Sequence, residues 1–202
     1  LTLNKDTSLE LVFEDTLNSS GELADADGSF RHVVRYGAIC ASYVRNMIGM
    51  GFDVHRLAEG ESLVLGGVTI DSPIGTVAHS DGDVVLHALV DAILGALALG
   101  DIGEHFPDTD PRWKGEPSST FVRHAVQLAR TEGYRLGNVD ISLVLESPKI
   151  LPYKQQMREM IAELTELPVN RVSVKATTSE RMGYVGRREG VHAWCVCELL
   201  PQ

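Results

Sequence analysis

The stretch AHSDGDVVLHALVDAILGALALGDIG (residues 78–103) contains a strong helical pattern. Its apolar residues recur at intervals of three and four over residues 81–99, which predicts a helix with a broad buried face. Ser80 is a preferred N-cap residue, and Asp83 follows it at the capping-box spacing. Asp83, His87 and Asp91 are four residues apart and share one face of this helix, so they form a polar seam on an otherwise apolar element.

Periodicity in the rest of the chain predicts further strands and helices. The expected strands are residues 47–57, 62–70, 138–146, 171–177 and 190–200, with Gly66-Gly67 as a tight turn or bulge inside the second, and the expected further helices are residues 118–132, ending at Gly133, and 153–166. This order of elements predicts an α+β fold, a small mixed sheet with helices packed on one face.

The chain divides near residue 46. Residues 1–46 have weak periodicity and include the polar patch NSSGELADADGS (18–29), so we expect a poorly ordered extension of unknown role. Residues 47–202 carry the regular patterns and form the expected folded domain.

Composition narrows the class of protein. Among 202 residues, 44% are apolar and 23% are charged, as in an ordinary globular protein. The net charge of −10 and the lack of a basic stripe argue against nucleic-acid binding. The most apolar run, residues 84–99, is too short for a membrane span. Cys40, Cys195 and Cys197 do not make a disulfide framework; the last two are expected in the core, and a reducing cytoplasmic setting fits.

Three residues form a candidate metal site. Asp53 and His55 lie in GMGFDVH (49–55), two apart on an expected strand, so their side chains point to the same face. With His87 they supply one carboxylate and two imidazoles, a donor set that suits zinc and leaves a fourth position open for chemistry. Asp83 or Asp91 could accept a hydrogen bond from the metal-bound imidazole of His87. The alternative is a histidine bonded to a helix carboxylate without any metal.

The loops that flank the helix have the composition of phosphate and cation sites. His79 and Ser80 precede a helix N-terminus, whose free N–H groups attract anions. The loop GDIGEHFPDTDP (100–111) offers carboxylates for hard cations or sugar hydroxyls, and SPKILP (147–152) and KATTSE (175–180) are further candidate loops. The sequence contains no P-loop, dinucleotide fingerprint, HExxH motif or G-x-S-x-G elbow, which removes those enzyme classes.

Several of these motifs together resemble one known family. GFDVH (51–55), the stretch 78–103, FPDTDPRWKG (106–115), GNVD (137–140), PKILP (148–152) and KATTSERMGYVGRREG (175–190) closely resemble the 2-C-methyl-D-erythritol 2,4-cyclodiphosphate synthases. The resemblance runs through most of residues 47–202 in the family order. It does not include residues 1–46.

The resemblance implies a reaction and an assembly. The family converts 4-diphosphocytidyl-2-C-methyl-D-erythritol 2-phosphate into the cyclic diphosphate and releases CMP, in the non-mevalonate isoprenoid route. It implies a homotrimer with active sites between subunits, and a central cavity that holds an isoprenoid diphosphate in some relatives, lined here by Arg187 and Glu189. It implies Zn²⁺ at Asp53, His55 and His87, and Mg²⁺ or Mn²⁺ at a second site with the substrate diphosphate.

The resemblance also assigns roles to residues. His79 and Thr178 are the expected catalytic residues, which position the diphosphate and stabilise the transition state, and Glu180 is the expected ligand of the second cation. The expected substrate-binding residues are Ser80, Asp101, Ile102, Gly103, Phe106, Pro107, Asp108, Thr109, Asp110, Leu145, Glu146, Ser147, Pro148, Lys149, Ile150, Leu151, Thr177, Ser179, Tyr184 and Arg187.

Two other functions stay open from the sequence. The first is a non-catalytic trimer that binds an isoprenoid diphosphate, against which the complete Asp53, His55 and His87 set argues. The second is a zinc-dependent phosphoesterase that uses metal-bound water as nucleophile. Products separate the latter from a cyclase, because hydrolysis incorporates solvent oxygen.

Overall fold

The computed structural model describes residues 23–24, 30–31, 46–107, 109–113 and 115–202. The chain forms two compact units, Leu1–Val44 and Arg45–Gln202. In the first unit the short strands β1 (Leu23–Ala24) and β2 (Phe30–Arg31) pair antiparallel. Most of the predicted extension, Cys40 included, lies outside the described residues, and its role stays a prediction.

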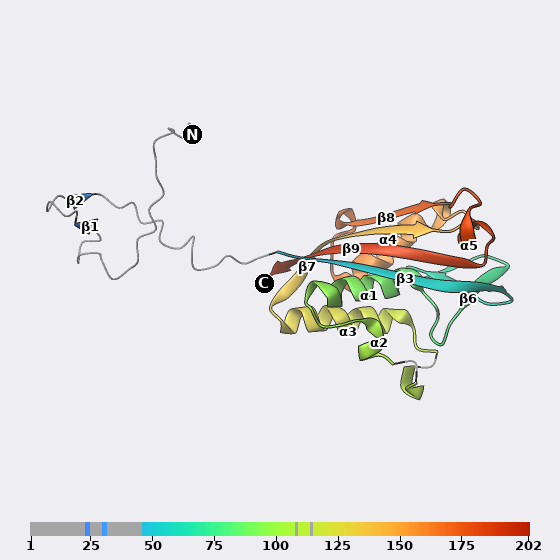
Figure 1. Cartoon of the computed structure of the whole chain (residues 1–202), viewed down its shortest axis with the longest axis horizontal. Helices are drawn as coiled ribbons and strands as arrows, with labels where there is room; N and C mark the ends of the chain where they lie inside the picture. The colour runs from blue at the N-terminus through green and yellow to red at the C-terminus, as the bar shows by residue number, and fades with distance from the viewer. Residues whose placement is uncertain (1–22, 25–29, 32–45, 108, 114) are drawn as a thin grey trace. The chain divides into compact units, whose positions relative to one another are not determined.

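A five-stranded mixed sheet organises the second unit (Figure 1). Its strand order is β6-β3-β9-β7-β8, with β7 and β8 parallel and the other pairs antiparallel. The strands are β3 (Met47–Glu59), β6 (Ile74–Val77), β7 (Tyr134–Val144), β8 (Val172–Thr177) and β9 (Gly190–Pro201). The predicted mixed sheet is therefore present, and β6 is a strand that the sequence patterns did not indicate.

Three helices pack on this sheet. Helix α1 (Val84–Ala96) contacts β3 and β9, α3 (Ser118–Thr131) contacts β7, and α4 (Lys154–Thr165) contacts β8. Helix α3 also contacts both other helices. Short helical segments complete the unit: α2 (Ile102–His105), α5 (Gly183–Gly186), η2 (Pro111–Trp113), η3 (Leu151–Tyr153) and η4 (Val169–Arg171).

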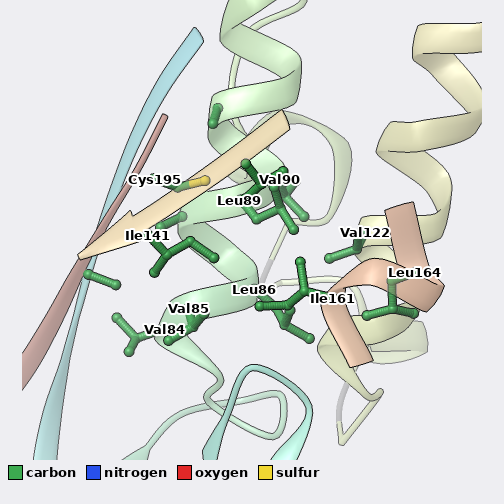
Figure 2. Close-up of a cluster of buried hydrophobic side chains, with 14 of the residues drawn as sticks. Val84, Val85, Leu86, Leu89, Val90, Val122, Ile141, Ile161, Leu164 and Cys195 are labelled. Carbon is green, nitrogen blue, oxygen red and sulfur yellow. The ribbon is translucent and has the colours of Figure 1, made fainter. Parts of the chain in front are cut away.

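The core lies between the sheet and these helices. Burial alternates along β3 and β9, so one face of each strand meets the helices and the other is open. Figure 2 shows Ile141 and Cys195 of the sheet with Leu86 and Leu89 of α1 in this cluster. Cys195 and Cys197 are both fully buried, which confirms the prediction that they are core residues.

Two local predictions were wrong. The single strand expected over residues 62–70 is a hairpin of β4 (Leu63–Leu65) and β5 (Val68–Ile70). The tight turn predicted at Gly66-Gly67 is confirmed, because both glycines adopt positive φ and reverse the chain. Helix α1 begins at Val84 and ends at Ala96, inside the predicted residues 81–99. Its N-cap is Asp83, not Ser80, since the left-handed Gly82 (φ +68°) breaks helical geometry before Asp83.

The buried carboxylate of Asp83 joins the hairpin to the helix. Its oxygens accept hydrogen bonds from the backbone N–H groups of Val85, Leu86, Gly66 and Gly67, at 2.6–3.1 Å. Burial raises the pKa of Asp83 to about 6, against the opposing effect of these backbone donors. Because Asp83 already accepts from the N–H groups of Val85 and Leu86, these two groups of α1 are not free to bind an anion.

Two glycines let α1 approach β3 closely. A Cβ on Gly49 would lie 1.8 Å from the carbonyl oxygen of Ala92, and one on Gly51 would lie 2.0 Å from that of Ala88. Only hydrogen fits at either position. The strand and helix backbones are therefore in direct contact along this line.

No helix among the residues that the structure describes combines the length and apolar character needed to cross a membrane.

We predict that Gly51→Ala lowers the free energy of unfolding by about 3 kcal/mol, because the added methyl group meets backbone atoms that cannot rotate away. Gly95→Ala is the matched control on α1, where the nearest atom is 3.8 Å away and alanine should add up to about 1 kcal/mol of helix stability. Urea unfolding measures both. Equal stability of the two variants would contradict the close packing described here.

Candidate metal centre and substrate cavity

Asp53, His55 and His87 meet at one point between β3 and α1. Asp53 Oδ2 lies 3.0 Å from His87 Nδ1 and 3.1 Å from His55 Nε2, and the two imidazole nitrogens are 3.1 Å apart. The strand alternation predicted from sequence places Asp53 and His55 on the helix-facing side of β3. Among the described residues these three form a group of ligand atoms that could hold a metal ion.

The electrostatics of this triad favour a cation between the three side chains. Burial alone would raise the pKa of Asp53, but hydrogen bonds and charge from His55 and His87 outweigh it and hold that pKa far below its usual range. Burial lowers the pKa of His87, and the Asp53 carboxylate more than offsets this, so the pKa of His87 is raised. Asp53 is thus ionised, and positive charge is stabilised on His87.

The triangle also has the right size for a metal. Tetrahedral ligands at roughly 2.0–2.1 Å from zinc are separated by roughly 3.3 Å, close to the separations found here. The donor set of two imidazoles and one carboxylate is one that zinc and similar divalent ions accept. The residues therefore fit a divalent metal with an open position.

A cavity of about 530 Å³ opens beside the triad. Its lining includes His55, His87 and six of the residues predicted to bind or act on substrate: His79, Ser80, Ile102, Gly103, Phe106 and Pro107. Trp113 and Phe121 form an aromatic wall together with Phe106, the rings lying 4.5–6.0 Å apart. This half of the predicted site is therefore one continuous space.

The hydrogen-bond partner of His87 is not the one predicted. Asp83 bonds the backbone groups described above, and Asp91 Oδ1 accepts a hydrogen bond from Ile102 N at 2.8 Å. Neither carboxylate reaches the imidazole, because each points toward a neighbouring turn. Instead Ser118 Oγ lies 2.8 Å from His87 Nε2, and Ser80 Oγ lies 3.3 Å from it.

The acidic loop after α1 is only partly at the cavity. Asp101 is the N-cap of α2, and its side chain accepts a hydrogen bond from Glu104 N. Asp110 pairs with Arg112, whose hydrogen bonds and charge lower the pKa of the Asp110 carboxyl. Thr109 does not line this cavity, and Asp108 lies outside the described residues.

A second, smaller cavity gathers the other predicted loops. Its volume is about 270 Å³, and Thr177 and Thr178 of the strand end face Lys149 of the 145–151 loop there. The remaining lining residues are Leu145, Glu146, Pro148, Ile150, Leu151, Lys154 and Ala176. It shares no lining residue with the triad cavity, so the two halves of the predicted site occupy separate spaces in a single chain.

Polar contacts hold the segment after β8 against the 145–151 loop. Thr178 Oγ1 donates to Glu180 Oε1 at 3.3 Å, and Glu146 Oε1 accepts from Arg181 N at 2.7 Å. Ser179 Oγ lies 3.2 Å from the same Glu146 oxygen. The predicted cation ligand Glu180 is thus beside the predicted catalytic residue Thr178.

Tyr184 belongs to α5, and Arg187 is the C-cap of that helix. Tyr184 Oη lies 2.5 Å from His192 Nδ1, and the Arg187 guanidinium pairs with Glu189 at 2.9 Å through two nitrogens. Neither residue lines a cavity described above.

Sequence reasoning missed several residues of this site. The sequence patterns did not select Ser118, Asp81, Trp113 and Phe121. Trp113, Ser118 and Phe121 nevertheless lie within twenty positions after the candidate loop 100–111. An alternating or helical pattern does not reveal which serine meets a histidine thirty-one residues away.

Residues 46–200 match the profile of the YgbB family. The chain belongs to the YgbB family.

Several proteins that are similar to this YgbB chain carry the name of one synthase. The chain is 57% identical over 150 residues to the 2-C-methyl-D-erythritol 2,4-cyclodiphosphate synthase of Chlorobaculum tepidum, covering 74% of this chain and 96% of the relative. A solved structure of such a synthase in a CDP-bound form has a TM-score of 0.71 at 44% identity, covering 75% of this chain and 99% of that chain. The bifunctional IspDF of Campylobacter jejuni has a TM-score of 0.76 at 44% identity, covering 78% of this chain and 43% of that chain.

We predict that His87→Ala in this YgbB chain abolishes metal binding at the triad and nearly all activity, because one of three ligands is lost. The chain should stay folded. Metal analysis after dialysis, with circular dichroism for folding, measures the effect. His124→Ala, on an exposed position of α3, is the control and should keep its metal. A His87→Ala protein with a full metal complement would contradict the assignment.

Proposed function

We propose that this chain catalyses the metal-dependent conversion of 4-diphosphocytidyl-2-C-methyl-D-erythritol 2-phosphate to 2-C-methyl-D-erythritol 2,4-cyclodiphosphate with release of CMP. One observation carries the proposal: an Asp53, His55 and His87 triad opens into a cavity in a chain 57% identical to an enzyme of that name. The reaction class is a phosphorus–oxygen lyase.

The chemistry of this reaction fits the side chains that are present. The 2-phosphate of the substrate attacks the β-phosphorus of its own diphosphate, a new P–O bond forms, and the bond from the β-phosphorus to the CMP oxygen breaks. A phosphate nucleophile is already ionised near neutral pH, so the reaction needs no general base. Since both reacting groups belong to one molecule, the protein must hold a folded geometry and balance charge.

Each part of the site has a proposed task. A divalent ion at the triad, which we propose to be Zn²⁺, supplies Lewis-acid charge stabilisation on the β-phosphate when bound. His79 and Ser80 bind phosphate oxygens at the cavity mouth, and Thr178 positions the diphosphate. Asp101, Ile102, Gly103 and the segment 106–110 enclose the methylerythritol.

The second cavity is proposed to hold the cytidine and its phosphates. Residues 145–151 offer backbone groups to the base, and Lys149 adds a positive charge. Thr177, Ser179 and Glu180 lie at the phosphate end, with Glu180 as ligand of Mg²⁺ or Mn²⁺ and Tyr184 and Arg187 as further ligand contacts. A CDP complex of a related synthase supports a nucleotide ligand.

We also propose that the protein is a homotrimer with each site between two subunits. The open face of β3 and β9 exposes a row of large apolar side chains: Ile48, Met50, Phe52, Val54, Trp194 and Val196, each 40–73% exposed. A contiguous apolar row of this kind marks a protein interface. A second copy on this face would also bring cavities from different chains together, which explains why the two halves of the site are separate in one chain.

Two smaller proposals accompany the trimer. A central cavity would be lined by Arg187 and Glu189 and accept an isoprenoid diphosphate, as the family resemblance implies. The cytoplasm is the proposed compartment, because the buried Cys195 and Cys197 are free thiols.

Product analysis in ¹⁸O-labelled water tests the activity. Purified protein with Zn²⁺, Mg²⁺ and the cytidine substrate should yield CMP and a cyclic diphosphate without ¹⁸O. Phosphorus NMR and mass spectrometry identify the products. A linear product containing one solvent oxygen would indicate the phosphoesterase alternative. Metal-loaded protein that binds but does not turn over the substrate would indicate the binding alternative.

We predict that Thr178→Val lowers kcat by about 10²–10³-fold with little change in metal content, since the hydroxyl is expected to act only in the transition state. Steady-state kinetics and metal analysis measure the two effects. Thr178→Ser should restore most of the turnover. Parallel loss of metal and activity in Thr178→Val would rule out the assigned role.

We predict that Met50→Glu converts the trimer into single chains, because a carboxylate would be buried in an apolar interface. Light scattering after size-exclusion chromatography measures the mass. Gln127→Glu on the exposed side of α3 is the control and should remain trimeric. A wild-type protein with the mass of one chain would refute the trimer.

A further inference from the structure

We propose that Ser118 and Asp81 position His87 for metal binding by fixing which of its ring nitrogens carries the proton. The inference rests on the metal site of the proposed function. It assigns a role to two residues outside the triad, one in the loop before α1 and one at the start of α3.

The two nitrogens of His87 face different groups. Nδ1 points to the metal position, at 3.0 Å from Asp53 Oδ2. Nε2 points the other way, at 2.8 Å from Ser118 Oγ. The Ser118 hydroxyl in turn donates a hydrogen bond to Asp81 Oδ1, and the backbone N–H of Ser118 donates to Asp81 Oδ2 at 3.1 Å.

The available protons determine which atom donates and which accepts in each of these hydrogen bonds. A carboxylate only accepts hydrogen bonds, so the single hydroxyl proton of Ser118 is directed to Asp81. Ser118 Oγ can then meet His87 only as an acceptor, and Nε2 must be the donor. The lone pair of neutral His87 is therefore on Nδ1, the atom that a metal would bind.

Burial makes this arrangement rigid. Ser118 is fully buried, and His87 is 8% exposed. Two hydrogen bonds from one residue to both oxygens of Asp81 fix the start of α3 against the loop that precedes α1. Ser80 Oγ is a weaker alternative partner, since it lies 3.3 Å from Nε2 and accepts a hydrogen bond from Gly82 N at 3.1 Å.

The arrangement has a consequence for the metal. Hydrogen bonding of the far N–H of a ligating histidine to an oxygen that is itself bound to a carboxylate holds the ring orientation and makes the ligand more basic. Loss of such a partner typically costs roughly 10–100-fold in metal affinity. Ser118 and Asp81 are positioning residues, because neither touches the metal position itself.

The first experiment measures zinc affinity of the full chain by competition with a chelator. Ser118→Ala is expected to bind Zn²⁺ roughly 10–100-fold more weakly than wild type. Ser118→Thr keeps the hydroxyl and should restore most of the affinity. Ser119→Ala, at the next position of α3, is the matched control and should bind as wild type does. Wild-type affinity in Ser118→Ala would overturn the proposal.

A second measurement reports the proton directly. In ¹⁵N-histidine-labelled, zinc-loaded protein, the Nε2–H proton of His87 should be resolved by NMR and slow to exchange with water. In Ser118→Ala it should be lost to exchange. A His87 ring that carries its proton on Nδ1, or an equally protected proton in the variant, would overturn the assignment.

These outcomes separate the inference from the proposed function. If wild-type protein binds no zinc through His87, the metal site fails, and the inference fails with it. If wild type binds zinc and Ser118→Ala matches it, only the role of Ser118 and Asp81 fails. If Ser118→Ala does not fold, Asp81→Asn replaces it, with weaker zinc binding expected and wild-type affinity contradicting the proposal.

Discussion

The direct contact of helix α1 with strand β3 is the constraint on which the site depends. Gly49 and Gly51 lie on the helix-facing side of β3, and the carbonyl groups of Ala88 and Ala92 occupy the space where their side chains would be. Asp53 and His55 follow on the same side of the same strand. Because the two backbones touch along the glycines, His87 of α1 arrives within 3.1 Å of both residues. A slightly more distant helix would leave three polar side chains too far apart to share an ion.

The surroundings of the triad divide its tasks. On the buried side, Asp83 fixes the start of α1 to the β4–β5 turn, and Ser118 and Asp81 hold the far nitrogen of His87. On the open side, the triad faces a cavity of about 530 Å³ with aromatic walls. Rigid support behind the ligands and space in front of them are what a metal site requires if a substrate phosphate is to reach the ion.

Much of this could be predicted from sequence, and the limits have physical causes. Strand alternation gave the shared side of Asp53 and His55, and helical spacing placed His87 on α1. The partner of His87 could not be found in this way, because Ser118 belongs to another helix and only the tertiary packing brings it near. Helical spacing offered Asp83 or Asp91 as the partner of His87, yet the Asp83 carboxylate caps the helix and binds Gly66 and Gly67, and Asp91 accepts a hydrogen bond from the backbone that follows α1. Composition marked residues 147–152 and 175–180 as candidate loops, but only the family resemblance assigned roles to their residues, because these side chains carry no periodic signal.

The central claim is that this packing builds a metal site from one carboxylate and two imidazoles. X-ray absorption spectroscopy at the zinc edge, on protein loaded with one equivalent of zinc, tests it most directly. We expect nitrogen and oxygen ligands at about 2.0–2.1 Å, with the scattering pattern of two imidazole rings that is lost in a variant without His55 and His87. A shell that contains sulfur, or a shell of oxygen alone, would contradict this account.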